Sequence, residues 1–115
     1  MPIPDEIRLR HMLDAARKAA ELVRGKSRPV LDQDEVLALA LVRLVEIIGE
    51  AASGTSTAVR TGNPQIPWHA VSAARNRLIH GYFDVDYDIL WQILTISIPE
   101  LISHLEKLVP PAAPP

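Results

Sequence analysis

The 115-residue sequence contains no cysteine and only five aromatic residues. Without cysteine, the chain has no disulfide, no thiolate zinc site and no cysteine nucleophile. With so few aromatic rings, aliphatic side chains and alanine must fill the interior. Basic residues are not in excess either, because the formal net charge is −2. The overall charge therefore does not indicate a nucleic-acid-binding protein.

The chain also lacks any long uncharged hydrophobic run. Its most apolar segment, residues 36–52, is too short to cross a membrane and carries three charges. Charged side chains occur throughout the first 24 residues, so we expect no secretory signal peptide and a cytoplasmic location. The composition, 48% hydrophobic and 23% charged, is typical of a globular domain. We predict one domain over residues 1–109, followed by a flexible proline-rich tail at 110–115.

Apolar residues recur at helical spacing over most of the chain. The pattern predicts a helix from Asp5 that ends before Gly25, and a second from Asp32 or Asp34 to about Ala52. Residues 53–67 have turn chemistry with about one helical turn near Ala58. A third helix is expected over 68–80, and the last runs to about Leu108 and is kinked or split by Pro99. No useful alternating strand pattern is present, so the fold class is all-α, a bundle of four to five helices.

The segment 36–52 is apolar on nearly all sides. This pattern favours a helix that is covered by the other helices and by a second copy of the chain. Its only charges, Arg43, Glu46 and Glu50, fall at positions i, i+3 and i+7. We interpret this stripe either as part of a functional cleft or as the one edge of the helix that faces solvent.

The predicted helix 68–80 has one face for packing and one face for chemistry. Imidazole, hydroxyl and amide side chains share an arc of about 80°, and Arg75 lies at its flank. An arginine can grip two phosphate oxygens, and an imidazole can move a proton to or from a ribose hydroxyl or a leaving oxygen. His80 falls in the last turn of this predicted helix. Because the C-terminal end of a helix favours a cation, we expect His80 to be held protonated there. The residues of this arc are His69, Ser72, Asn76 and His80.

The sequence offers no convincing metal site, and we expect no cofactor. The four histidines lack the spacing of zinc ligands. Asp84, Asp86 and Asp88 resemble the start of a calcium loop, but Ile89 and Thr95 stand where that loop needs its glycine and its final glutamate. We interpret the aspartates as a capping and solvated turn.

A longer run then points to a family. Residues 66–86, IPWHAVSAARNRLIHGYFDVD, resemble the signature of the HepT-like family within the HEPN superfamily. Members of that family are toxin ribonucleases encoded beside small MNT-type nucleotidyltransferase antitoxins. The family motif is arginine, four residues, histidine, one residue, tyrosine, and Arg75, His80 and Tyr82 match it. Residues 47–51 (IIGEA) and 66–68 (IPW) resemble family segments too, and the likeness extends from the first helix to about Leu108.

The resemblance implies a homodimer that cleaves RNA, such as tRNA or mRNA, without a metal in a cleft between the two copies. It implies that Arg75 stabilises the scissile phosphate, that His80 is the general acid or base, and that Asn76 orients substrate or histidine. Tyr82 would accept AMP from the nucleotidyltransferase, and that bulky charged group would block the cleft. We expect Glu46, Arg43, Glu50, His69 and Ser72 to line the same cleft.

Other interpretations remain open at this point. Arg75 could be a surface ion-pair partner, His80 and Asn76 could be structural, and Tyr82 could simply pack beside Phe83. At the level of function, the alternatives are a non-catalytic nucleotide-binding or substrate-binding partner of a nucleotidyltransferase, and a plain helical dimerisation protein. RNA is a polyanion while residues 29–115 hold five basic against ten acidic side chains. Either the basic N-terminal segment (residues 1–28) lines the approach to the cleft through Arg8, Arg10, Arg17 and Lys18, or RNA binding is weak and salt-sensitive.

Overall fold

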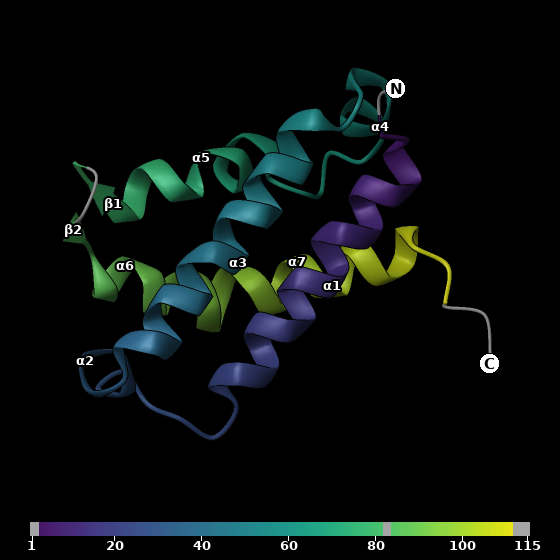
Figure 1. Cartoon of the computed structure of the whole chain (residues 1–115). Coiled ribbons are helices and arrows are strands. Elements are labelled where there is room, and N and C mark those ends of the chain that lie inside the picture. Colours follow the sequence, from purple (N-terminus) through teal and green to yellow (C-terminus); the bar gives the residue numbers. More distant parts are fainter. Residues whose placement is uncertain (1–2, 82–83, 112–115) are drawn as a thin grey trace.

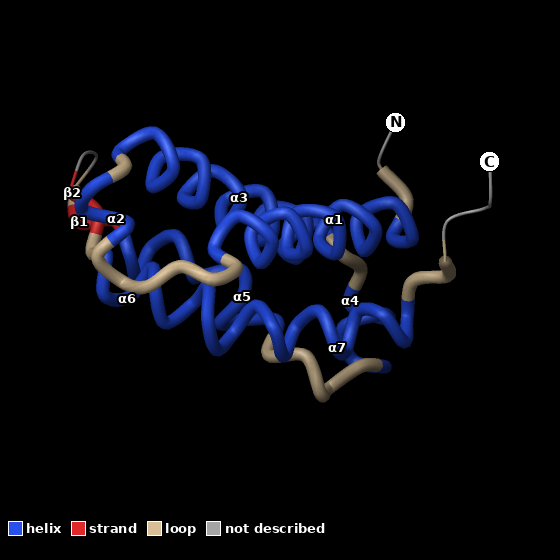
Figure 2. Tube along the Cα trace, turned by 90° about the horizontal axis from the view of Figure 1, so that it is seen from below, coloured by secondary structure: helices blue, strands red, loops and turns tan. Residues whose placement is uncertain are grey.

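The computed structural model describes residues 3–81 and 84–111. Within them the chain forms an all-α bundle, as the sequence predicts, in two layers of helices. Figure 2 shows α1 and α3 in one layer and α5, α6 and α7 in the other. Figure 1 shows that α1 and α3 run in opposite directions and that the β1 and β2 strands lie at one end of the bundle. None of the helices in residues 3–81 and 84–111 is long and apolar enough to cross a membrane.

Helix α1 spans Asp5–Val23, in agreement with the predicted boundaries. Asp5 and Glu6 in its first turn complement the positive end of the helix dipole. Beyond the helix, Gly25 adopts a left-handed φ of 73° that reverses the chain direction. The apolar stripe of α1 is buried against α3 and α7. The buried members are Leu9, Met12, Leu13, Ala15, Ala16, Ala19 and Val23.

A short helix α2, Val30–Gln33, precedes the long helix α3, Glu35–Gly54. Asp34 caps α3, because its Oδ1 accepts a hydrogen bond from Leu37 N–H at 3.0 Å. Most apolar side chains of α3 are buried, but Val36 is 79% exposed and Leu39 is 60% exposed. The other helices of the same chain therefore leave the start of α3 uncovered.

Helix α4, Thr57–Gly62, is the short turn of helix expected near Ala58. Ser56 caps it, and Asp5 accepts hydrogen bonds from Ser56 N–H at 2.8 Å and from Ser56 Oγ at 2.6 Å. These bonds tie the start of α1 to the start of α4.

Helix α5, Trp68–Leu78, ends two residues earlier than the sequence pattern predicts. Ile79–His80 instead forms the strand β1, which pairs antiparallel with β2, Asp84–Val85. The carbonyl of Leu78 accepts a hydrogen bond from Asp86 N–H at 2.6 Å, and Gly81 has a φ of 71°. Ile79 and His80, the last residues of the expected helix, therefore pair with the β2 strand instead of continuing α5.

The C-terminal helical segment runs without a break from α6, Tyr87–Gln92, through the π-helical η1, Ile93–Ser97, to α7, Ile98–Leu108. Proline lacks an N–H and its ring clashes with the carbonyl four residues back in a regular α-helix. The π-helical turn directly before α7 accommodates Pro99, so the segment is interrupted in its hydrogen bonding rather than split.

Candidate functional site

Helix α5, which carries most of the predicted site, packs closely against α3. Gly49 of α3 makes this approach possible, since a Cβ atom there would lie 3.2 Å from the carbonyl oxygen of Val71 and 3.3 Å from that of Ser72. Both distances are shorter than an ordinary van der Waals contact. Gly49 therefore fixes how near α5 lies to the charged stripe of α3.

The close packing brings Arg75 to the charged stripe. Arg75 Nε lies 3.3 Å from Glu46 Oε2, while Arg43 lies 3.9 Å from Glu46 and 3.7 Å from Glu50. The Glu46 side chain is 24% exposed and that of Arg75 is 51% exposed. The stripe and the motif arginine thus form one charge cluster, in which Glu46 is the least exposed member.

The prediction that His80 lies in the last turn of a helix is wrong. His80 lies in β1, after the residue Ile79 that caps α5. Its carboxylate neighbour is Asp86, whose Oδ2 is 3.7 Å from His80 Nε2. A side-chain carboxylate, rather than helix carbonyls, is therefore the group that faces this imidazole.

Asp86 is a neighbour of the motif histidine that sequence reasoning assigned only to capping. The assignment is correct in part, because Asp86 Oδ1 accepts hydrogen bonds from the N–H groups of Asp88 and Ile89, both at 3.0 Å. The second oxygen is left to face His80. The Ile89 N–H does most to lower the pKa of Asp86, partial burial opposes it, and the Asp88 N–H and His80 lower it further. Asp86 is therefore anionic at neutral pH and held in a fixed orientation.

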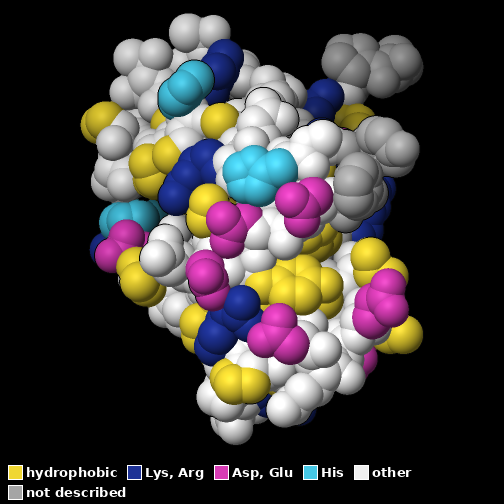
Figure 3. Space-filling model, turned by 90° about the vertical axis from the view of Figure 1, so that its left-hand side faces the viewer, with side chains coloured by type: hydrophobic (Ala, Val, Ile, Leu, Met, Phe, Trp, Pro, Cys, Tyr) yellow, Lys and Arg dark blue, Asp and Glu magenta, His cyan; other side chains and the backbone are white. Residues whose placement is uncertain are grey.

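Figure 3 looks onto the end of the molecule that carries β1, β2 and α6. Histidine and arginine side chains lie there among acidic ones, so positive and negative groups alternate over this face. In residues 3–81 and 84–111, no hydrogen bond or ion pair joins Arg75 to His80 directly. Asn76 is exposed on α5 next to Arg75. Tyr82 lies outside the described residues.

His69 and Ser72 are also exposed or partly exposed on α5, but they lie in a separate hollow of ≈ 510 Å³ near α4. The structure therefore brings Arg43, Glu46 and Glu50 to Arg75, and it places His69 and Ser72 farther along the same helix.

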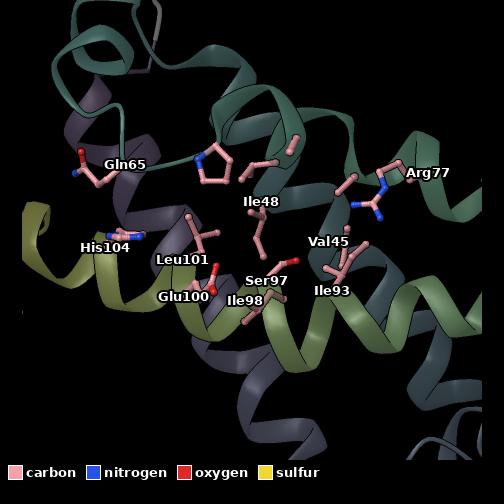
Figure 4. A pocket seen from close by; sticks show the side chains of 14 residues that line it. Val45, Ile48, Gln65, Arg77, Ile93, Ser97, Ile98, Glu100, Leu101 and His104 are labelled. Atoms are coloured by element: carbon pink, nitrogen blue, oxygen red, sulfur yellow. The ribbon is translucent and has the colours of Figure 1, made fainter.

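A second cavity, of ≈ 230 Å³, lies between α5 and the η1–α7 segment. Figure 4 shows Ile48, Leu101 and Ile98 around its middle, with Arg77 at one end and Gln65 and His104 at the other. None of the predicted site residues lines it. In the described part of the chain, no group of three or more histidine, aspartate or glutamate side chains is arranged to hold a metal ion.

Comparison with known proteins agrees with the resemblance. The model of the family described as "Ribonuclease HepT-like" matches residues 12–108. A candidate RNase of Caldanaerobacter subterraneus subsp. tengcongensis is 36% identical over 88% of this chain and 90% of its own. A "Probable ribonuclease HepT" of Thermococcus cleftensis is 34% identical over 84% of this chain and 91% of its own. No solved structure matches the chain. The chain belongs to the HepT-like ribonuclease family.

Proposed function

We propose that this ribonuclease is the toxin of a toxin–antitoxin pair and cleaves RNA without a metal ion through Arg75 and His80. One observation carries the proposal: each of the two motif residues has a carboxylate neighbour, Glu46 at 3.3 Å for Arg75 and Asp86 at 3.7 Å for His80. A cation that is held in place by a carboxylate can still offer its remaining nitrogens to a substrate.

The chemistry needs only the RNA and these side chains. The ribose 2′-oxygen attacks phosphorus, the bond from phosphorus to the 5′-oxygen breaks, and a 2′,3′-cyclic phosphate and a 5′-hydroxyl form. His80 takes the proton from the 2′-hydroxyl or gives one to the departing 5′-oxygen. Arg75 stabilises the negative charge that develops on the phosphate oxygens. Asn76, adjacent to Arg75 on the exposed face of α5, orients the substrate.

Glu46 acts in this proposal as a positioning residue. It contacts Arg75 at Nε, so the two terminal nitrogens of the guanidinium are outside that contact and are available to a phosphate. Glu46→Gln is expected to lower kcat more than it raises KM, because the arginine is misplaced rather than absent. Glu35→Gln, on the exposed first turn of α3, is the matched control and should leave both constants unchanged.

We place the cleft between two copies of the chain. Val36, Leu39, Arg43, Glu46 and Glu50 share one side of α3, within an arc of about 80°. Their spacing of three and four residues is that of a helix-pairing surface, and its first two members are exposed apolar side chains. A second copy on this surface would lie beside Arg75.

Light scattering tests this arrangement. Leu39→Glu is expected to give a monomer that no longer cleaves RNA. Ile96→Glu changes an equally exposed side chain on η1, 60% exposed like Leu39, and is expected to remain an active dimer. Equal masses for Leu39→Glu and the wild-type protein would contradict the proposed interface.

The partner in this proposal is an MNT-type nucleotidyltransferase that transfers AMP to Tyr82. Tyr82 follows His80 by two residues, so an adenylate would add bulk and negative charge next to the proposed acid or base. Co-expression with such an enzyme should add one AMP to Tyr82, detected by mass spectrometry, and should abolish cleavage. Tyr82→Phe should stay unmodified and active.

The experiment for the activity itself uses total RNA with EDTA present throughout. The wild-type protein should cleave, and His80→Ala and Arg75→Ala should not. Absence of cleavage by a folded wild-type protein whose Tyr82 is unmodified would instead favour a non-catalytic partner subunit of a nucleotidyltransferase.

A further inference from the structure

The hollow near α4 has no role in the site described above. It lies where the C-terminal end of α3, helix α4 and the first turns of α5 meet. Hydroxyl groups, one guanidinium and one imidazole line it, and these are groups that donate hydrogen bonds to anions. They belong to Ser53, Thr57, Thr61, Ser72, Arg60 and His69.

Arg60 is the fixed positive charge of this hollow. Arg17, Arg24, Arg28, Arg43 and Arg75 each form an ion pair with a carboxylate, whereas Arg60, like Arg8, Arg10 and Arg77, forms none with residues 3–81 and 84–111. Its Nε is buried and does not reach the hollow, whereas its NH2 group makes only a long 3.5 Å contact with Thr57 Oγ1 and can still donate to a ligand. An unneutralised guanidinium with unused donors suits a phosphate group.

The hollow is aligned with the proposed catalytic residues. Ser72 lies three residues before Arg75 on α5, and His69 lies six residues before it. With a rise of about 1.5 Å per residue, these are about 4.5 and 9 Å along the helix axis. A strand of RNA whose scissile phosphate contacts Arg75 therefore passes the hollow if it follows the exposed face of α5.

Part of the charge of the basic N-terminal segment is already paired within the protein. Arg17, Arg24 and Arg28 of that segment pair with Glu106, Glu21 and the aspartates 32 and 88. The charge of these three is largely compensated, whereas Arg8 and Arg10 donate to the backbone carbonyls of Ile3 and Pro110 and form no ion pair with a described carboxylate.

We propose that the hollow is an RNA subsite, in which Arg60 and the surrounding hydroxyl groups bind a backbone phosphate adjacent to the one that is cleaved. The inference rests on the proposed ribonuclease function and adds a binding site to it. Trp68 is a wall of the subsite and not a stacking platform, since its ring is buried and its Nε1–H donates to the carbonyl of Asn63 at 3.0 Å.

The test measures binding of a fluorescent single-stranded RNA in the His80→Ala background at several salt concentrations. Arg60→Gln should weaken binding several-fold at low salt and reduce the slope of log K against log salt by about 0.7, the value for one lost phosphate contact on a single strand. Arg60→Lys, which keeps the charge, should retain the slope. Arg24→Gln removes a surface arginine directly after α1 and should change neither quantity.

Kinetics with His80 intact give the second readout. Arg60→Gln should raise KM for RNA and leave kcat unchanged, because the subsite lies beyond the reacting atoms. If Arg60→Gln fails to fold, Thr57→Glu replaces it, since a carboxylate in the first turn of α4 suits the helix and should repel the phosphate.

Wild-type affinity and salt slope in Arg60→Gln or Thr57→Glu would overturn the subsite while leaving the ribonuclease function intact. Binding of AMP should be measured with the same variants. If Arg60→Gln binds RNA like the wild-type protein but no longer binds AMP, the hollow holds a free nucleotide, and this result would also overturn the subsite. Failure of the wild-type protein both to bind and to cleave RNA would contradict the proposed function instead.

Discussion

Replacement of Gly49 by alanine sets two known effects against each other. Glycine inside a helix is less favourable than alanine by about 1 kcal/mol, so helix propensity alone predicts a more stable protein. However, the new Cβ would lie 3.2 and 3.3 Å from two backbone carbonyl oxygens of α5. A backbone cannot rotate away as a side chain can, so α5 must shift by a few tenths of an ångström.

Overpacking of a core costs about 1–3 kcal/mol. The net expectation for Gly49→Ala is therefore destabilisation by up to about 2 kcal/mol. For a domain of this size, about 4 °C of Tm corresponds to each kcal/mol, so Tm should fall by up to about 8 °C. The shift of α5 should also lower RNA cleavage, because the spacing of α3 and α5 sets the contact between Glu46 and Arg75.

Thermal unfolding followed by circular dichroism measures the effect. Gly62→Ala is the matched control, because a Cβ at that exposed helical position meets no atom within 4 Å. It should leave Tm unchanged or raise it slightly. An increase of Tm in Gly49→Ala as large as helix propensity predicts would refute the close-packing argument.

Two further predictions concern the carboxylates of Asp86 and Asp5. Asp86→Asn keeps the cap of α6, because asparagine caps a helix as well as aspartate does. It removes the charge that faces His80, so it should lower kcat several-fold and shift the pH–rate profile. The control variant Asp88→Asn should do neither. Hydrogen bonds from the Ser56 hydroxyl and N–H lower the pKa of Asp5, so its contribution to stability is present above about pH 4 and is lost as the pH falls through the lowered pKa. The Tm difference between the wild-type protein and Asp5→Asn should accordingly be constant near neutral pH and shrink as the medium becomes acidic. A difference that stays the same as the pH is lowered below about 4 would contradict this role.

The sequence predicts the helices of this fold well because they are long and their apolar spacing is regular. Asp5 and Gly25 delimit α1 as expected, and Asp34 caps α3. The hairpin at 79–85 could not be predicted in this way. Its strands have two residues each, which is too short for an alternating pattern, and they form through pairing with residues farther along the chain.

The unpredicted hairpin also explains why the contact between Asp86 and His80 could not be predicted from the sequence. The helical projection correctly places Ser72 and Asn76 on the accessible side of α5, but it extends the helix through His80. The capping signal of Asp86 was visible in the sequence. Its second role depends on the hairpin, which brings one carboxylate oxygen to His80, and no local pattern reports that contact.

The contact between Glu46 and Arg75 was expected only as a shared cleft. The spacing of Arg43, Glu46 and Glu50 identifies a stripe, but it does not say which helix the stripe faces. Packing at Gly49 decides this, because it brings α5 rather than another helix close to that side of α3. The catalytic roles of these residues stay predictions.

The central claim is that His80 and Arg75 cleave RNA by attack of the 2′-hydroxyl without a metal. The most direct measurement uses an RNA oligonucleotide that spans a mapped cleavage position, with and without a single 2′-deoxy substitution there, in the presence of EDTA. The wild-type protein should cut the all-ribose strand to a 2′,3′-cyclic phosphate and leave the substituted strand intact, while His80→Ala should cut neither. Cleavage of the 2′-deoxy strand, or cleavage by His80→Ala at the wild-type rate, would contradict the account.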